Sequence, residues 1–169
     1  MSDDLLIDLP TGLHTRERLM SDLSDAIGRE RGTTLLVLFS LQGASTYGER
    51  EGPARRDELL VRLSHRLTTA LDGAARCYRT REVELAALID APIATAMALL
   101  TDAVTALEDE ALEDEGESES ERVGLTSSFG AAILPDEAED SIAALMLADE
   151  RLFLNSGSRM ERRYFASRR

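Results

Sequence analysis

Residues 33–41 read Thr-Thr-Leu-Leu-Val-Leu-Phe-Ser-Leu, and this segment sets the expected fold. It is dense in β-branched and apolar residues, and it is apolar without interruption from Leu35 to Phe39. A run of this kind predicts a strand that is buried on both faces of its sheet. Helices must then cover both faces, so the sequence predicts a mixed α and β domain around this strand.

Amphipathic helices are predicted before and after this strand. A turn at 10–12 precedes a helix over 13–27, in which apolar residues recur at helical spacing. Apolar stripes also predict helices over 54–71, 91–112 and 141–155. The last of these is expected to present one row of residues to the core: Ile142, Leu145, Met146, Asp149, Leu152 and Phe153.

Three more strands complete the expected sheet. Residues 75–80 and 83–89 are typical of two strands with a tight turn near Arg81, and 122–134 is typical of a last strand. The glycines and the proline between 43 and 53 predict a long irregular connection. The order of elements contains a ferredoxin-like βαββαβ core sheet flanked by helices, which places the chain in the α+β class. That architecture does not by itself assign a function.

The charge of the chain is uneven. The formal net charge is −13, yet nine acidic residues fall within 108–121, where there is no basic residue. This run is predicted to be a solvated loop, with docking on a basic partner as the other interpretation. For an arginine-rich tail at 159–169, three alternatives stay open: contact with that loop, contact with an anionic surface, or no contact. A net charge of this sign repels a phosphate backbone, so nucleic acid is not an expected partner.

Composition excludes several other classes of protein. No apolar run approaches the ~20 residues that cross a bilayer, and the first residues are acidic, unlike a secretory signal. The single cysteine, Cys77, excludes an internal disulfide and a multi-cysteine metal site, and its place in a strand predicts a core residue. All nineteen basic residues are arginine, which excludes lysine-based catalysis. We expect one cytoplasmic domain over 1–169, with no membrane insertion.

Four short motifs occur in a recognisable order. The first is D-L-P-T-G-L-H-T-R at 8–16, and the second is D-E-L-L at 57–60. S-F-G-A-A follows at 128–132, and A-D-E-R-L-F at 148–153. Over residues 5–165, these motifs and their spacing resemble the GGDEF domains of diguanylate cyclases. The resemblance implies a nucleotidyl-cyclase-like fold. In that family, two protomers each hold one GTP with Mg²⁺, and the two GTP molecules are condensed into cyclic di-GMP.

This sequence departs from the family where that reaction needs particular groups. The resemblance places Ser40 and Gln42 at two aspartates of a metal-binding strand end, and Gly48 at an asparagine that reads guanine. Arginine and glutamate replace the two glycines of the signature, and Val83 replaces its acidic third residue, while Glu84 keeps the fourth. Mg²⁺ prefers oxygen ligands, commonly including one or two carboxylates. We therefore expect no metal, no cofactor and no catalytic residue.

Phosphate and inhibitory contacts are also lost in this resemblance. Ser156 and Met160 stand at the family's phosphate-binding lysine and arginine, and residues 72–75 at its product-inhibition motif. Arg56 stands where the family has a glycine before the D-E-L-L motif. Asp57 matches a second guanine-contacting position, but it is equally an ordinary carboxylate in the first turn of a helix. Six positions therefore count as remnants of a nucleotide site: Ser40, Gln42, Gly48, Asp57, Val83 and Glu84.

Two further expectations concern charged pairs, and one concerns the histidines. Glu82 and Glu84 lie two residues apart and are expected on one strand face, as a solvated edge or a displaced metal site. The side chain of Asp8 is expected to pair with that of Arg16. Both histidines, at positions 14 and 65, are expected to be surface or half-buried residues without a ligand role.

These observations predict a catalytically inactive GGDEF-like module that acts in signalling through protein contacts. Its partner is expected to be a second copy, in a homodimer, or another regulatory protein, and a nucleotide ligand is not expected. Two alternatives stay open. One is a non-catalytic sensor of GTP or cyclic di-GMP that uses Asp57 and Glu84, and the other is an active cyclase with a rearranged site.

Overall fold

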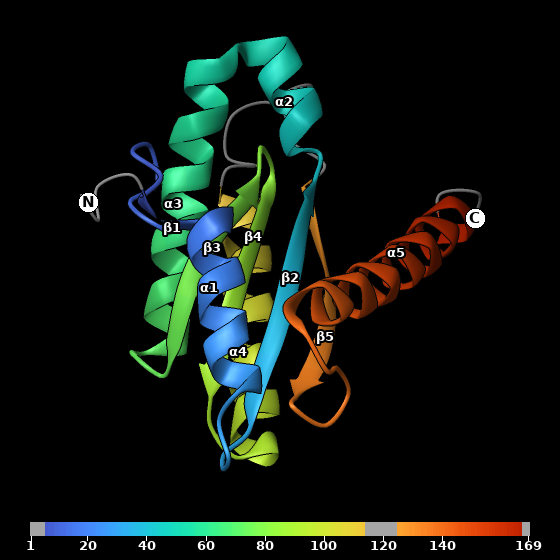
Figure 1. Ribbon diagram of the computed structural model, residues 1–169. Coiled ribbons are helices and arrows are strands. Elements are labelled where there is room, and N and C mark those ends of the chain that lie inside the picture. The colour runs from blue at the N-terminus through green and yellow to red at the C-terminus, as the bar shows by residue number, and fades with distance from the viewer. Residues whose placement is uncertain (1–5, 114–124, 167–169) are drawn as a thin grey trace.

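The computed structural model describes residues 6–113 and 125–166, with side chains described to residue 108 in the first range and to residue 156 in the second. It contains all the helices and strands that the sequence predicts, in the predicted order, together with one further strand and one further helix (Figure 1). The elements are, in chain order, β1 His14–Thr15, α1 Arg16–Ile27, β2 Thr34–Gln42, α2 Ala44–Glu51, α3 Pro53–Leu71, β3 Ala75–Arg81, β4 Glu84–Asp90, α4 Ile93–Glu113, β5 Thr126–Leu134 and α5 Ser141–Ala166.

The sheet has the strand order β1-β3-β4-β2-β5. Strand β2 lies antiparallel to β4 on one side and to β5 on the other, and β3 is antiparallel to β4. These four strands, with their connecting helices, are the predicted ferredoxin-like core, so the predicted α+β fold is confirmed. The short strand β1 is an addition that pairs in parallel with β3 at the edge of the sheet.

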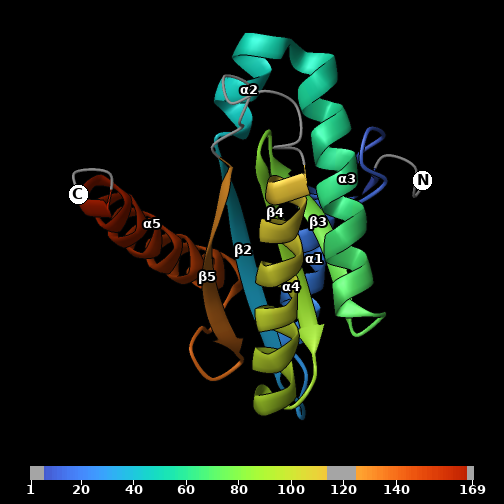
Figure 2. The same cartoon turned by 180° about the vertical axis from the view of Figure 1, so that it is seen from behind.

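Helices cover both faces of this sheet. Figure 1 shows α1 and α5 on one face, and Figure 2 shows α3 and α4 on the other. The side chains of β2 alternate between the two layers, because successive residues of a strand point to opposite faces. Leu35, Val37 and Phe39 pack in the α3/α4 core, whereas Leu36 and Leu38 pack in the α1/α5 core. The prediction of a strand buried on both faces is therefore confirmed.

Residues 44–51 form helix α2, so the predicted irregular connection between 43 and 53 is wrong. Gly43 precedes this helix with a φ of 93°, and Gly52 follows it with a φ of 98°. Glycine adopts such positive values without strain, so these two glycines mark the ends of the helix. The third glycine, Gly48, is buried within α2.

Helix α5 packs on the sheet through a face that only partly coincides with the predicted row. Its buried residues are Ala144, Leu145, Ala148 and Leu152, whereas three residues of the predicted row are exposed, namely Ile142 (64%), Met146 (68%) and Phe153 (77%). The cause lies in β5. A Cβ atom at Gly130 would collide with the Ala148 carbonyl oxygen and the Leu152 nitrogen, so α5 approaches the bare backbone of β5 on its alanine side.

The acidic run and the arginine-rich tail also differ from expectation where the structure describes them. Helix α4 ends at Glu113 and so includes the start of the run predicted as a loop over 108–121; residues 114–121 lie outside the described residues, as do 122–124 of the predicted last strand. Helix α5 continues to Ala166, so most of the predicted tail is helical, and 167–169 lie outside the described residues. Among the helices described, none is both long and apolar enough to span a membrane.

Strand β5 forms one edge of the sheet, and side chains bond to its outer backbone groups. Arg151 Nη1 donates to the Ala131 carbonyl at 2.8 Å, and Asn155 Nδ2 donates to the Phe129 carbonyl at 2.6 Å. The amide of Ile133 donates to Glu137 Oε2 at 2.8 Å. These three hydrogen bonds fix α5 and the loop before it along the edge strand.

Candidate functional site

A small polar cluster occupies the α2 end of the sheet. Ser40 on β2 lies opposite Glu84 on β4 and opposite Ser128 on β5. By strand alternation, all three face the layer of α1 and α5. Glu84 is buried, and Thr80 Oγ1 donates to its Oε1 at 2.6 Å. The hydroxyl of Ser128 is buried without a hydrogen-bond partner. The cluster therefore combines one carboxylate with three hydroxyls.

These donors do not fit a magnesium-bound triphosphate. Glu84 is the single carboxylate of the cluster, and Ser40 offers only a neutral hydroxyl where the resemblance implies an aspartate. Gln42 instead accepts a hydrogen bond from Thr126 Oγ1 at 3.2 Å, and Val83 packs against the α3/α4 core. Within the described residues, no group of three or more His, Cys, Asp or Glu side chains is placed to hold a metal ion. Mg²⁺ beside phosphates is commonly held by one or two carboxylates, and this cluster supplies one where the resemblance implies several.

The hairpin between β3 and β4 separates the two glutamates that were expected on one face. Arg81 pairs with Glu84, so Glu82 and Val83 form the two-residue turn. Glu82 is an exposed turn residue that bonds to Arg56 on α3, whereas Glu84 is buried on the α1/α5 side. The expectation of a shared face, and with it a displaced metal site at these two residues, is wrong because the hairpin closes between them.

The turn forms without the two glycines of the family signature. Among the described residues, Asp72 is the only non-glycine with a positive φ, so both turn residues have ordinary negative values. The strand register shifts between Arg79 and Arg81, which leaves an irregularity next to the turn. Such a bulge changes the twist of a hairpin and lets ordinary residues close it. The loss of the two glycines therefore reduces the free space at the turn but does not prevent the turn from forming.

Gly48 and Arg56 occupy one space between α2 and α3. A Cβ atom at Gly48 would lie 3.0 Å from both Cβ and Cδ of Arg56, closer than ordinary van der Waals contact. The resemblance implies an asparagine at position 48 and a glycine at position 56. In this chain, the small and the large residue have changed places. The stem of Arg56 thus fills the space beside α2, and its guanidinium bonds to Glu82 in the hairpin turn.

Asp57 belongs to a network of arginines and carboxylates. Its Oδ1 lies 3.4 Å from Arg56 Nη2 and 3.3 Å from Arg79 Nη2. Arg79 also pairs with Asp8 at 3.3 Å and donates to the Glu82 carbonyl at 2.8 Å. These contacts join α3, β3, the hairpin and the entry segment, so Asp57 has a structural role in addition to any ligand role.

The predicted pair of Asp8 and Arg16 is wrong. Asp8 accepts hydrogen bonds from the backbone and the hydroxyl of Thr11, at 3.1 and 2.6 Å, and from Arg79. Burial alone would raise the pKa of Asp8, but the hydrogen bonds from Thr11 and the charge of Arg79 outweigh it and hold that pKa below its usual value. This carboxylate closes the turn that ends at Gly12, whose φ is 71°.

Arg16 instead borders a cavity of about 130 Å³ on the α1/α5 face, beside Glu84. Arg81 and Asp149 bring further charges to its wall. The complete lining is Arg16, Leu38, Arg81, Glu84, Leu145, Met146 and Asp149. Sequence reasoning did not bring Arg16, Arg81 and Asp149 together around Glu84. Strand alternation could have placed Glu84 on the layer of α1 and α5, where these residues lie.

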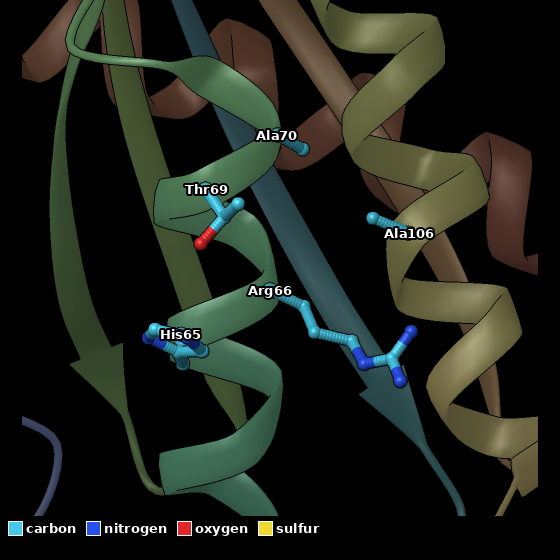
Figure 3. Close-up of a pocket in the computed structure, with 5 residues that line it drawn as sticks. All are labelled: His65, Arg66, Thr69, Ala70 and Ala106. Carbon is cyan, nitrogen blue, oxygen red and sulfur yellow. The ribbon is translucent and has the colours of Figure 1, made fainter.

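A larger groove of about 330 Å³ lies between α3 and α4 (Figure 3). His65, Arg66, Thr69 and Ala70 line it from α3, and Ala106 lines it from α4. His65 is exposed there and His14 is half-buried in β1, as expected for both. The His14 ring lies 5.7 Å from that of Tyr78.

Cys77 is a core residue, as predicted. It is buried in β3, and burial raises the pKa of its thiol from 9.0 to about 12. A thiol with so high a pKa is almost entirely protonated near neutral pH, and the thiolate is the reactive form. Burial and the raised pKa of the thiol both disfavour a nucleophilic role for Cys77.

Comparisons with known proteins concern the fold. No protein-family profile and no curated protein matches the sequence. Among solved structures, the GGDEF domain of FimX from Pseudomonas aeruginosa superposes with a TM-score of 0.73, covering 90% of this chain and 94% of its own at 20% identity. This chain has the GGDEF fold.

Other GGDEF structures agree with this assignment. A sensory box/GGDEF family protein from Caulobacter crescentus gives a TM-score of 0.74 at 22% identity, covering 90% of this chain and 99% of its own. The diguanylate cyclase SiaD from Pseudomonas aeruginosa, solved in complex with its activator SiaC, gives 0.76 at 19% identity, covering 90% of this chain and 58% of its own.

Two positions that the resemblance assigns to phosphate-binding cations hold neutral residues instead. Ser156 lies on α5 after the last contact with β5, and the side chain of Met160 lies outside the described residues. Asp72 ends α3 with a φ of 43°, and Ala75 begins β3. Asp72 and Ala75 are the two ends of the segment matched to the product-inhibition motif, and neither carries the charge that the resemblance implies at its position.

Proposed function

We propose that this chain is a non-catalytic signalling module with the GGDEF fold, and that it acts through protein contacts. The observation that carries the proposal is the surroundings of Ser40, which faces one buried carboxylate and a second serine. Two GTP-bound half-sites must present acidic oxygens to Mg²⁺ for the family's reaction. Ser40 and Val83 supply none.

Two further contacts support the proposal. Arg56 occupies the space beside Gly48, where the resemblance implies guanine recognition, and its charge is paired with Glu82 and Asp57. A solved neighbour, SiaD, is a cyclase held in complex with a protein activator. This example supports protein contact as a mode of action for proteins that contain this fold.

A product assay tests the catalytic half of the proposal. The full chain is incubated with GTP and Mg²⁺ at millimolar concentrations, and cyclic di-GMP is measured by chromatography beside an active cyclase. We expect no product, because Ser40 and Val83 cannot help to hold the metal. Product that forms with this chain and disappears in Glu84→Ala would show an active cyclase with a rearranged site instead.

A non-catalytic nucleotide sensor is the second candidate, and the retained carboxylate of Asp57 favours it. Its side chain is 34% exposed, and solved DgcB structures from Caulobacter crescentus hold cyclic di-GMP on the same fold. Calorimetry with GTP-Mg²⁺ and with cyclic di-GMP separates the candidates. We expect no heat up to millimolar ligand, because Arg56 and Arg79 already engage Asp57. Heat that is lost in Asp57→Asn but kept in the exposed neighbour variant Glu58→Gln would establish the sensor.

A further inference from the structure

The cavity of about 130 Å³ on the α1/α5 face has charges of both signs in its wall, and the two signs come from different sides. The two cations come from the β3 side of the sheet: Arg16 begins α1, which packs against β3, and Arg81 ends β3. The two carboxylates come from the side of β2 and β5. Glu84 begins β4, and Asp149 belongs to α5, which packs against β2 and β5 (Figure 1). The cavity therefore has a positive wall and a negative wall.

These charged groups do not satisfy one another. Within the part of the chain that the structure describes, neither Arg16 nor Asp149 is in an ion pair, although both line the same cavity. Glu84 is buried, and its Oε1 accepts a hydrogen bond from Thr80 Oγ1. Its Oε2 lies 3.8 Å from Arg81 Nη1, which is too long for a hydrogen bond. Because a buried carboxylate oxygen without a donor costs free energy, Oε2 is a place for a donor supplied by a ligand.

Apolar side chains form the rest of the cavity wall, namely Leu38, Leu145 and Met146. Leu38 belongs to the central strand and is buried, so the sheet gives the cavity an apolar floor. At ~30 Å³ for each water in the liquid, the cavity has room for about four waters. A ligand that fills it is therefore small, of the size of alanine, and a methyl group suits the floor.

We propose that this cavity binds a small zwitterion, namely an aliphatic α-amino acid of about the size of alanine. Its carboxylate lies against Arg16 and Arg81, and its ammonium group lies against Glu84 and Asp149. A ligand with a single charge would meet the same charge in one of the two walls, whereas a zwitterion meets an opposite charge in each. The inference goes beyond the proposed function, because it gives the module a ligand that is neither a nucleotide nor a protein.

Calorimetry on the full chain with three probes tests the proposal. Alanine carries both charges, propionate is alanine without the ammonium group, and ethylamine is alanine without the carboxylate. We expect saturable heat with alanine, at a dissociation constant of about 1 mM or lower. Propionate and ethylamine are each expected to bind at least about tenfold more weakly, because each leaves one charged wall without its partner. No saturable heat with alanine up to about 10 mM, or equal affinity for either analogue, overturns the proposal.

Two variants place the ligand in this cavity. Asp149→Asn and Arg16→Gln each remove one charge from the wall, and each is expected to weaken alanine binding about tenfold. Glu150→Gln is the matched control, because Glu150 is exposed on α5 but does not line the cavity, and it is expected to bind alanine as the wild type does. Circular dichroism confirms that the variants are folded. Wild-type affinity in both Asp149→Asn and Arg16→Gln overturns the site. Formation of cyclic di-GMP would overturn the proposed function and leave this result unchanged.

Discussion

At the scale of single residues, Glu137 shows how one carboxylate is held in its charged form. Arg151 donates to it twice, from Nη1 to Oε2 and from Nη2 to Oε1, each at 2.8 Å. The Ile133 amide donates to it as well. The hydrogen bonds from Arg151, followed by that from Ile133, lower the pKa of Glu137 from 4.5 to about 2.

This lowered pKa predicts a defined acid sensitivity. A carboxylate whose pKa is lower in the folded state contributes stability above its unfolded pKa and loses it as the pH falls through the folded value. The contribution of Glu137 is therefore complete above about pH 4.5 and is lost as the pH falls towards 2. Glu137→Gln is expected to lower Tm at pH 6 and to flatten the fall of Tm in that acid window.

Thermal melts at a series of pH values check this expectation. Glu139→Gln, at an exposed position in the same loop, is the matched control and is expected to follow the wild-type curve. Parallel curves for the wild type and Glu137→Gln would contradict the prediction, because the lowered pKa would then carry no stability.

The remnant positions show what the sequence can tell about single residues. The loss of carboxylates at Ser40 and Val83 is readable from the sequence, since it depends only on residue type and spacing. The exchange between Gly48 and Arg56 is readable as two substitutions but not as a contact. Only the packing of α2 on α3 shows that one residue fills the space left by the other.

At the scale of elements, the fit of α5 on β5 depends on Gly130. The carbonyl of Ala148 and the nitrogen of Leu152 lie where a Cβ atom would stand. Because these are backbone atoms of a helix, they cannot move aside singly. Any side chain at position 130 must therefore displace the whole helix from the sheet.

Gly130→Ala is expected to destabilise the fold by about 3 kcal/mol, the upper part of the usual range for overpacking. Urea unfolding measures the change. Gly28→Ala is the matched control, because Gly28 has a φ of −73° and a helical conformation that alanine adopts freely. We expect Gly28→Ala to leave stability unchanged or slightly increased. Equal midpoints for Gly130→Ala and the wild type would show that α5 does not depend on this close approach.

The helices and strands also differ in how well the pattern of apolar residues in the sequence predicts them. Helix α3 was predicted because its apolar residues repeat at a clear period, and the central strand was predicted because its apolar run is uninterrupted and bounded by turn residues. Helix α2 was missed because Gly43 and Gly52 end a helix here, whereas glycines in sequence also indicate loops. The face of α5 was predicted only in part: Leu145 and Leu152 are buried, but the backbone at Ala148 approaches Gly130, and larger apolar residues of the predicted row stay exposed.

At the scale of the whole molecule, a net charge of −13 acts against compactness. Like charges repel across the folded surface, and exposed ion pairs such as Arg55 with Glu58 each contribute at most about 1 kcal/mol. Repulsion among the excess negative charges is therefore expected to outweigh the stabilisation that the surface ion pairs contribute.

Added salt should accordingly stabilise this protein. Since the screening length falls to ~10 Å at about 0.1 M salt, we expect Tm to rise from low salt to that range and then to level off. Melts in sodium chloride, with sucrose at equal osmolality as the control for solvent effects, measure the change. A Tm that falls with salt would mean that the ion pairs outweigh the net repulsion.

The bonded outer edge of β5 has a consequence for how copies of this chain meet. An open strand edge is a template on which another chain can add a strand, the first step of β-aggregation and of many strand exchanges. Here Arg151, Asn155 and Glu137 already satisfy three of the backbone groups that an incoming strand would need. Growth of the sheet from one molecule into the next is thereby obstructed at β5.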